Sequence, residues 1–294
     1  MAGSLRSFTA ADRPAVLELS RHALARPEEQ VGNPMWASRE EMESELAGWE
    51  HPPEDSLFVD DQEGKIAGFG GIEAAPGWEH ADLFGPLVTP GFRGQKIGSR
   101  LLEASIEAGR GRGANRIIGS VGTRNVTGRL LLERKGFRAF GSPSEIYRLL
   151  QRSHRPMLDG PHGVTVRRGG VEDLGAALEL YRECFPGGHF PESTWQDALE
   201  RGTVYLAGKD GQAIGFIDID PSDRWAYHVG VTTAERDRRV ASYLLSRALE
   251  DYWSRHPDEP LGLSVSADNI PAIRLYRRLG FQPWLVLQPF ELVL

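Results

Sequence analysis

The spacing of hydrophobic and polar residues predicts one order of elements that occurs twice along the chain. Apolar runs of strand length alternate with stretches whose apolar residues recur at helical spacing, and Gly-containing turns mark two hairpins. Each half is predicted to contain a strand, two helices, a hairpin, a strand, a long helix, a strand, a short helix and a closing pair of strands. The ranges in the first half are residues 5–8, 11 onward, 39–49, 56–60, 66–74, 81–88, 97–109 and 116–121. Those in the second half are residues 164–167, 172 onward, 192–200, 204–208, 213–219, 225–231, 240–256 and 261–266.

Two segments of similar sequence each join a predicted strand to a predicted long helix. The first begins at Val88 and the second at Val231, 143 residues later. A strand that runs into a helix exposes backbone N–H groups at the helix N-terminus, where the helix dipole also favours negative charge. These segments are therefore candidate pyrophosphate-binding loops. The candidate residues are Val88, Arg93, Gly94, Gln95, Lys96, Ile97, Gly98 and Ser99 in the first loop, and Val231, Arg236, Arg238, Arg239, Val240, Ala241 and Ser242 in the second.

A second landmark follows each loop at nearly constant distance. Asn125 lies 32 residues after Arg93 in the first half. Asn269 lies 33 residues after Arg236 in the second half. In both halves a Gly-Phe pair stands 11 residues after the asparagine. Two landmarks that agree in order and spacing indicate an internal duplication.

The bulk properties of the chain fit two ordinary globular domains. A length of 294 residues allows each half to bury its own core. Breakers of regular structure cluster in one stretch between the halves. We expect one domain over residues 1–152, a linker over 153–163 and a second domain over 164–294.

Charge and cysteine content exclude several classes of protein. The net charge of −7 argues against a general nucleic-acid binder, which normally carries a basic surface. Cys184 is the only cysteine, so neither an intrachain disulfide nor a cysteine-based metal cluster is expected. No apolar stretch approaches the length of a signal peptide core or a membrane span. We therefore expect a cytoplasmic protein without membrane or nucleic-acid partners.

The two loops and the two Asn-initiated helices resemble those of the GCN5-related N-acetyltransferase (GNAT) family, once in each half. The resemblance implies an α/β (α+β) fold of two tandem GNAT-like domains, each a mixed, largely antiparallel sheet flanked by helices. It also implies acetyl-CoA as cosubstrate, no metal, and the primary amine of a small molecule or peptide as acceptor. The sequence leaves a monomer and a homodimer open.

Both loops depart from the family pattern Gln/Arg-x-x-Gly-x-Gly/Ala at its middle glycine. That position is Lys96 in the first loop and Arg239 in the second. We expect a side chain to be accepted there if the turn keeps φ negative, because backbone N–H groups bind the phosphate. The first loop keeps Gly94, whereas the second has Asp237, whose carboxylate is unfavourable beside a pyrophosphate. From the loops alone, we expect the N-terminal half to be the better acetyl-CoA site.

The Asn-initiated helices favour the C-terminal half instead. The resemblance implies that Tyr276 lies near the thioester sulfur and protonates the departing thiolate, whereas its counterpart Leu132 cannot. It also implies that Asn125 and Asn269 lie near the pantetheine arm of the cofactor. The same residues allow a structural interpretation, with Tyr276 as a core aromatic and both asparagines as helix N-caps.

Several side chains are candidates for the base that deprotonates the acceptor amine. Some relatives carry a carboxylate six residues before the loop valine, where Asp82 stands in the first half and Trp225 in the second. His228 is the alternative in the second half, because an unperturbed histidine titrates near neutrality. Each can equally be a solvated group on a strand. Further candidates are Glu73 and Glu79 in the first half and Asp218 and Asp220 in the second.

Three functions are compatible with these features. The leading hypothesis is an acetyl-CoA-dependent N-acetyltransferase in which at least one domain is productive. The length and duplication are also similar to those of mycothiol synthase, which acetylates a cysteinyl amine. The third hypothesis is a regulatory module that binds acyl-CoA without turnover, because neither half keeps every part of the family motif.

Overall fold

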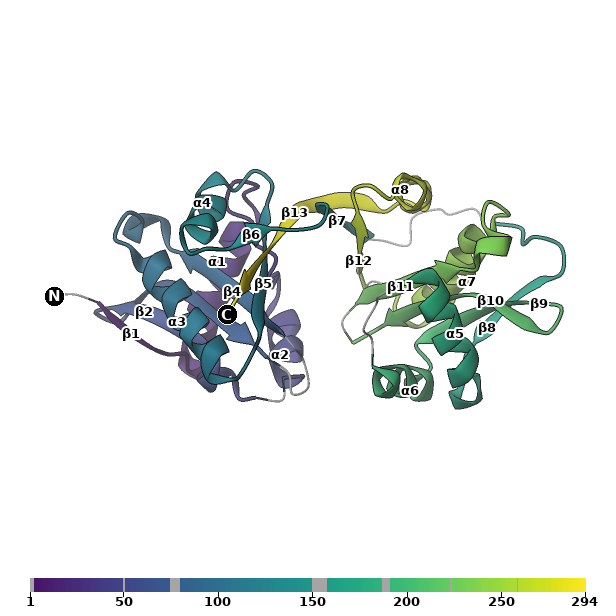
Figure 1. The fold of residues 1–294 in the computed structure, drawn as a ribbon, viewed down its shortest axis with the longest axis horizontal. Helices are drawn as coiled ribbons and strands as arrows, with labels where there is room; N and C mark the ends of the chain where they lie inside the picture. The colour runs from purple at the N-terminus through teal and green to yellow at the C-terminus, as the bar shows by residue number, and fades with distance from the viewer. Residues whose placement is uncertain are drawn as a thin grey trace. The chain divides into compact units, whose positions relative to one another are not determined.

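The chain divides into two units, and neither unit is one continuous stretch of sequence. The computed structural model describes residues 3–49, 51–74, 80–149, 158–186, 191–222, 224–257 and 259–294. The N-terminal unit comprises Met1–Glu145, Ser266–Asp268 and Leu285–Leu294. The C-terminal unit comprises Ile146–Val265 and Asn269–Trp284. Figure 1 labels the helices and strands of both units.

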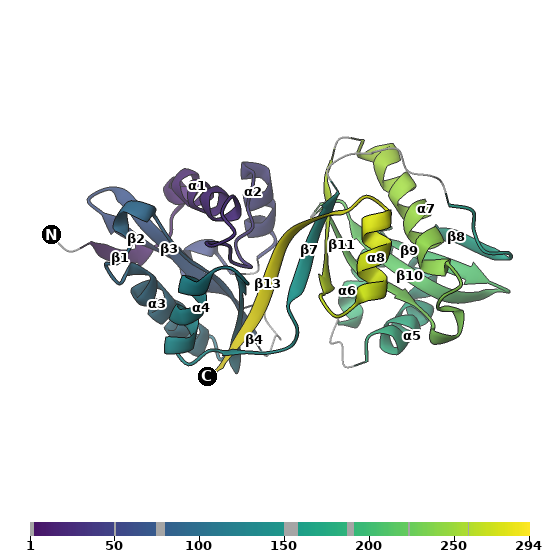
Figure 2. The same ribbon diagram turned by 90° about the horizontal axis from the view of Figure 1, so that it is seen from above.

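The N-terminal unit is a mostly antiparallel sheet with helices on both faces. Its strands lie in the order β1-β2-β3-β4-β5-β13, and β4–β5 is the parallel pair. Figure 2 shows α1 and α2 on one face and α3 and α4 on the other. The elements are β1 (Ser4–Ser7), α1 (Arg13–Leu24), α2 (Arg39–Ala47), β2 (Leu57–Gln62), β3 (Lys65–Glu73), β4 (His80–Val88), α3 (Ile97–Gly111), β5 (Arg116–Gly122), α4 (Val126–Arg134), β6 (Arg138–Ala139) and the end of β13 (Gln282–Val293).

The C-terminal unit repeats this plan. Its strands lie in the order β8-β9-β10-β11-β12-β7, and β11–β12 is parallel. Figure 2 shows α7 on one face and α5 and α6 on the other. The elements are β7 (Ser144–Leu149), β8 (Val164–Arg168), α5 (Leu174–Cys184), α6 (Glu192–Arg201), β9 (Val204–Lys209), β10 (Gln212–Asp220), β11 (Trp225–Val231), α7 (Val240–Arg255), β12 (Leu261–Ser266) and α8 (Ile270–Arg278). The predicted fold class is confirmed, and no helix of the described residues is long and apolar enough to cross a bilayer.

The final strands differ from the prediction. The sequence predicts a closing pair of strands in each half, but the second half ends in the single strand β13. Residues Leu287–Val293 of β13 pair antiparallel with Gly122–Arg116 of β5, inside the N-terminal unit. Most of β7, from the first half of the sequence, belongs to the C-terminal unit. The domain boundaries at 1–152, 153–163 and 164–294 stay a prediction, and residues 151–157 lie outside the described residues.

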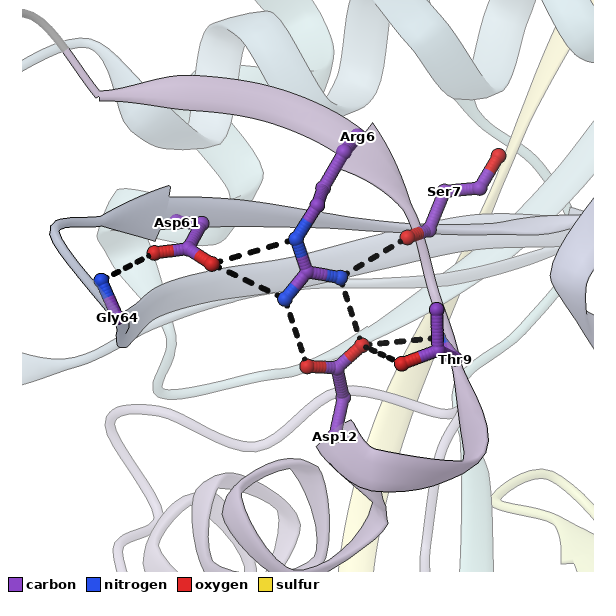
Figure 3. Close-up of polar contacts among 6 residues, drawn as sticks. All are labelled: Arg6, Ser7, Thr9, Asp12, Asp61 and Gly64. Atoms are coloured by element: carbon purple, nitrogen blue, oxygen red, sulfur yellow. Dashed lines mark hydrogen bonds and ion pairs between the residues drawn. The ribbon is translucent and has the colours of Figure 1, made fainter.

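An arginine–aspartate pair fastens the opening strand to the first helix in both units. In the N-terminal unit both terminal nitrogens of Arg6 donate to Asp12 at 2.8 Å, and Arg6 also reaches Asp61 (Figure 3). These bonds hold the pKa of the Asp12 carboxyl below its usual range. The C-terminal unit repeats the pair, with Arg167 donating twice to Asp173 at 2.7 Å. The duplication therefore preserves the connection from strand to helix as well as the loops.

Replacing Phe290 with alanine is expected to destabilise the N-terminal unit, although Phe290 belongs to the last strand of the sequence. Its ring is 1% exposed within the N-terminal core, and truncating a buried Phe costs about 3–5 kcal/mol. Hydrogen–deuterium exchange should become faster in β4 and β5. Val293→Ala is the control on the same strand, because Val293 is 75% exposed. Unchanged exchange in β5 of the Phe290→Ala variant would contradict this placement of β13.

Candidate active site

Each unit contains a pair of parallel strands that are hydrogen-bonded at one end only. The β4–β5 pairing runs from His80 with Arg116 to Asp82 with Ile118, whereas β4 continues to Val88. The β11–β12 pairing covers only Trp225 with Gly262 and Ala226 with Leu263. The two parallel strands of each unit therefore part before the loop that follows the first of them. Parted strands leave backbone groups along their facing edges that a ligand can bind.

A β-bulge interrupts the antiparallel ladder of both β4 and β11 shortly before the loop. In β4, Gly85 and Pro86 stand opposite the single residue Gly70. In β11, Tyr227 and His228 stand opposite Asp218. A bulge disrupts the local ladder and redirects backbone groups, and bulges are common beside active sites. Both units thus redirect the backbone of the strand that leads into the loop.

The two candidate phosphate loops follow the same backbone path despite different side chains. Arg93 and Arg236 are extended, with φ of −67° and −63°, and each Nε donates at 3.3 Å to the carbonyl of the valine that ends the strand. Lys96 and Arg239 then form the helix N-caps in the left-handed region, with φ of 60° and 64°. The condition on which a side chain was expected to be accepted here, a negative φ, is therefore not met in either loop.

The left-handed residues carry a physical cost that the fold retains in both copies. A non-glycine residue in this region is disfavoured by about 1–2 kcal/mol. The residue after each arginine is also left-handed, as Gly94 with φ of 79° and as Asp237 with φ of 61°. Successive backbone N–H groups in such turns form a concave anion site. Strain of this kind that persists in two copies points to a functional constraint.

The remaining loop residues serve as anchors or lie in solvent. Ile97 and Val240 are each 1% exposed and fix the first turn of α3 and of α7 in the core. A Cβ on Gly98 would lie 3.2 Å from Leu131, whereas the C-terminal counterpart is Ala241. The exposed candidates are Arg93, Gly94, Gln95, Lys96, Arg236, Arg238 and Arg239, the half-buried ones are Val88, Ser99, Ala241 and Ser242, and Val231 is buried.

Two loop arginines, Arg93 and Arg238, form ion pairs that were not predicted from the sequence. Arg93 donates to both carboxylate oxygens of Glu29, at 3.0 and 2.6 Å. Arg238 lies 3.7 Å from Glu235, which also pairs with Lys209 at 2.9 Å. Glu235 lies within the loop sequence, so its ion pair with Arg238 could have been predicted. Glu29 lies 64 residues from its partner, and no local pattern indicates that contact.

The N-terminal unit brings two candidate carboxyls together. Asp82 on β4 is the register partner of Glu73 on β3, and His80 lies 3.8 Å from Asp82. Burial raises the pKa of Asp82, and burial together with the charge of Asp82 raises the pKa of Glu73 to about 7. One carboxyl of this pair can therefore hold a proton near neutrality. Glu79 lies outside the described residues.

His228 in the C-terminal unit lies among aromatic rings. Its ring centroid is 5.3 Å from Tyr181, 5.6 Å from Phe185 and 5.8 Å from Trp195. Burial lowers the pKa of His228 to about 4, below the near-neutral pKa of an unperturbed histidine. The side chain is therefore a neutral imidazole at pH 7.

The other two C-terminal carboxylates have structural partners. Thr203 donates to Asp218 at 2.7 Å. Arg201 and Ser222 donate to Asp220, and the hydrogen bonds to Ser222 help to lower the pKa of Asp220. These contacts support the structural interpretation of both residues. Among the described residues, no group of three or more His, Cys, Asp or Glu side chains could hold a metal ion.

The Asn-initiated helices differ between the units. Asn125 caps α4 by accepting from Gly128 N–H at 2.8 Å, and its amide donates to the Gln30 carbonyl at 3.0 Å. Asn269 caps α8 but lies exposed. Tyr276 is 7% exposed, and burial raises its pKa to about 12, so its hydroxyl stays protonated. Leu132, its counterpart, is a core residue at 1% exposure.

Known proteins share this arrangement. The model of the Acetyltransferase (GNAT) family matches residues 22–137 and 174–281, more than half of the chain. A mycothiol acetyltransferase from Nocardia farcinica (strain IFM 10152) is 26% identical over 243 residues, covering 76% of this chain and 78% of that protein. A GCN5-related N-acetyltransferase from Sphaerobacter thermophilus has a similar fold, with a TM-score of 0.82, 22% identity and coverage of 99% of this chain and 95% of the other. A tandem GNAT protein from the clavulanic acid biosynthesis pathway has a TM-score of 0.69, 18% identity and coverage of 99% and 98%. The chain therefore belongs to the GNAT family of acetyltransferases and contains two GNAT domains.

Proposed function

We propose that the protein transfers an acetyl group from acetyl-CoA to a primary amine by direct attack. The observation that carries this proposal is the loop backbone, which takes the same strained left-handed path into α3 and into α7. Family membership supports an acetyltransferase, and the amine acceptor is our inference. We further propose a small-molecule or peptide acceptor.

The loop residues suit the pyrophosphate of acetyl-CoA. The first helical residues of α3 and α7 have N–H groups without intrahelical partners, and these groups point out of the helix N-terminus. Side chains at Lys96, Arg236 and Arg239 are exposed and add positive charge, whereas the guanidinium of Arg93 is paired with Glu29. A Cβ on Gly94 would meet no atom within 4 Å, so the turn is open to a ligand. When bound, acetyl-CoA would supply the activated acetyl group.

The acid and base groups differ between the units. The amine must lose a proton as its nitrogen bonds to the carbonyl carbon and the carbon–sulfur bond breaks. In the N-terminal unit, the Glu73 and Asp82 pair is the candidate acceptor of that proton. In the C-terminal unit, neutral His228 would accept the proton and Tyr276 would donate one to the departing thiolate. Backbone N–H groups beside each bulge are candidate donors to the developing oxyanion.

A second candidate function is acetylation of a cysteinyl amine, as in mycothiol formation. The supporting observation is that the mycothiol acetyltransferase from Nocardia farcinica aligns with 76% of this chain, so the similarity spans both halves. Activity on a cysteinyl pseudodisaccharide, with none on ordinary amines, would favour this candidate. Binding of CoA without transfer to any amine would favour the regulatory module instead.

A valine in the left-handed position of a working loop is expected to abolish acetyl-CoA binding. A β-branched residue is a genuine outlier at positive φ, so the N–H groups should turn out of the anion site. With a panel of amines as acceptors, the rate at which acetyl-CoA releases free CoA thiol should fall at least tenfold in Arg239→Val or Lys96→Val. The matched controls Arg239→Gly and Lys96→Gly also remove the basic side chain but permit the left-handed turn, so each should lose less. If neither wild type nor any variant releases thiol above background, and acetyl-CoA does not raise the Tm of the wild type, the proposal fails.

Removing the hydroxyl of Tyr276 is expected to slow transfer without weakening cosubstrate binding. Tyr276→Phe keeps the ring that packs edge-on against Phe281 and removes only the proton donor. General acid catalysis typically contributes about 10²–10⁴-fold, so kcat should fall by at least tenfold while KM for acetyl-CoA stays constant. Leu275→Met is a control on the same helix. A kcat within twofold of wild type would leave Tyr276 as a core residue only.

The carboxyl pair of the N-terminal unit predicts a specific pH dependence of stability. The folded state raises the pKa of Glu73 to about 7, so between that value and its ordinary pKa the folded chain binds more protons than the unfolded chain. Stability from this residue therefore falls as pH rises from about 4.5 to 7. Glu73→Gln removes the titration and should stabilise the protein at pH 8 by about 2 kcal/mol more than at pH 5. Urea unfolding at both pH values tests this, and an equal change at both would refute the coupling.

A further inference from the structure

The segment Gln30–Asn33, in the connection between α1 and α2, lies between the parted strands of the N-terminal unit. Beyond Ile118, strand β5 is no longer paired with β4. There the Gly32 N–H donates to the Ser120 carbonyl at 2.7 Å, and the Gly122 N–H donates to the Gln30 carbonyl at 2.8 Å. Val31 and Val121 form an antiparallel bridge between these two bonds. The segment therefore acts as a short strand on β5.

These bonds lie on the edge of β5 that faces β4. Alternate residues of a strand turn their backbone groups to opposite edges. The other edge of β5 pairs with β13, and Thr123 N–H donates to the Val286 carbonyl on that side. Ser120 and Gly122 each lie an odd number of residues from Thr123, so their backbone groups point to the opposite edge. Their bonds to the segment therefore point into the gap between β4 and β5.

The same segment also binds the β4 side of the gap. The N–H of Gly85, in the bulge of β4, donates to the Asn33 carbonyl at 2.7 Å. Asn125, which the family resemblance assigns to the pantetheine arm, donates instead to the Gln30 carbonyl at 3.0 Å. Gln30 is 7% exposed and Val31 is 5% exposed, so the segment is part of the interior of this unit.

Two glycines permit this close pairing. A Cβ on Gly32 would lie 2.8 Å from the Cβ of Ser120, and a Cβ on Gly122 would lie 3.0 Å from the Cβ of Gln30. Glycine within a strand often marks a close approach of another backbone. Just before the segment, Glu29 binds the loop residue Arg93 through both carboxylate oxygens. Backbone, glycine and ionic contacts thus agree on one position for the segment.

The C-terminal unit differs at the corresponding place. The connection between α1 and α2 runs from Ala25 to Ser38, twice the length of the connection from Phe185 to Pro191 between α5 and α6. Residues 187–190 of that shorter connection lie outside the described residues, so the contrast between the units is one of length. Within the part of the chain that the structure describes, no carboxylate forms an ion pair with Arg236, the counterpart of Arg93.

We propose that Gln30–Asn33 closes the strand gap of the N-terminal unit with the chain's own backbone, so that the C-terminal unit alone takes up acetyl-CoA. This inference rests on the proposed function and opposes the expectation drawn from the loop glycines. The pantetheine arm of CoA carries amides that need backbone partners, and in the N-terminal gap the segment already bonds to backbone groups of Gly85, Ser120 and Gly122. The N-terminal unit then serves as a scaffold, and its carboxyl pair stands apart from the thioester.

Titration calorimetry of the full chain with CoA tests this inference. Wild type should bind one CoA per chain, and Arg239→Val should abolish that binding. Hydrogen–deuterium exchange with CoA should slow at residues 237–242 and stay unchanged at residues 94–99. Two sites in wild type, or slowed exchange at residues 94–99, would overturn the inference but leave the proposed function intact. No CoA binding at all would refute the proposed function and this inference with it.

Displacement of the segment provides a second test. Gly32→Ala places a Cβ 2.8 Å from that of Ser120, so the segment should leave β5 and the number of CoA sites should rise from one to two. The control Gly111→Ala adds the same atom to the same unit, where a Cβ would meet nothing within 4 Å, and should keep one site. A folded Gly32→Ala variant, with fast exchange at Gly122 and still one site, would overturn the inference. If this variant does not fold, the wild-type stoichiometry and exchange pattern decide the matter.

Discussion

The fold of each unit depends on the point where two parallel strands stop pairing. At that point the hydrogen-bond ladder between the two strands ends, and the exposed backbone groups need other hydrogen-bond partners. The bulge in β4 or β11 redirects the strand, and the loop after it enters a helix through a left-handed residue. Core residues such as Ile97 and Val240 hold the helix start in place. The result is a candidate anion site made of main-chain groups, which tolerates changes of side chain and is therefore compatible with duplication.

The two units differ in the groups that lie at the gap between their parted strands. In the N-terminal unit the chain supplies its own partners through Gln30–Asn33, and the Asn125 side chain bonds to both Gly128 and Gln30. In the C-terminal unit the corresponding connection is short, Asn269 is exposed, and Tyr276 stands where the first unit has Leu132. A stable core and an open ligand site make opposite demands on the same backbone groups. One chain with two units can meet each demand in a different unit.

The sequence predicted those parts of the structure that depend on local interactions. The predicted limits of β11 and β12 agree with the structure, because short apolar runs bounded by breakers leave little choice. The N-caps at Asn125 and Asn269 were also foreseen, since a side-chain oxygen three residues before a free N–H is a local signal.

Features that depend on distant contacts escaped prediction. The sequence predicted closing strands but not the pairing of β13 with β5, and nothing local to Arg93 indicates Glu29. The left-handed turn at Lys96 and Arg239 was missed because basic residues do not normally favour positive φ, and here the surrounding fold imposes it. His228 illustrates the same limit, because its low pKa arises from aromatic rings contributed by other elements.

The central claim is that main-chain amides at a left-handed turn bind the diphosphate of CoA. Amide resonances in ¹H–¹⁵N NMR spectra, compared between titrations with CoA and with pantetheine, test it most directly, because pantetheine lacks the diphosphate. The account predicts that CoA shifts the amide resonances of Arg239, Val240 and Ala241 and that pantetheine leaves them in place. Equal shifts with both ligands, or none with CoA, would contradict it.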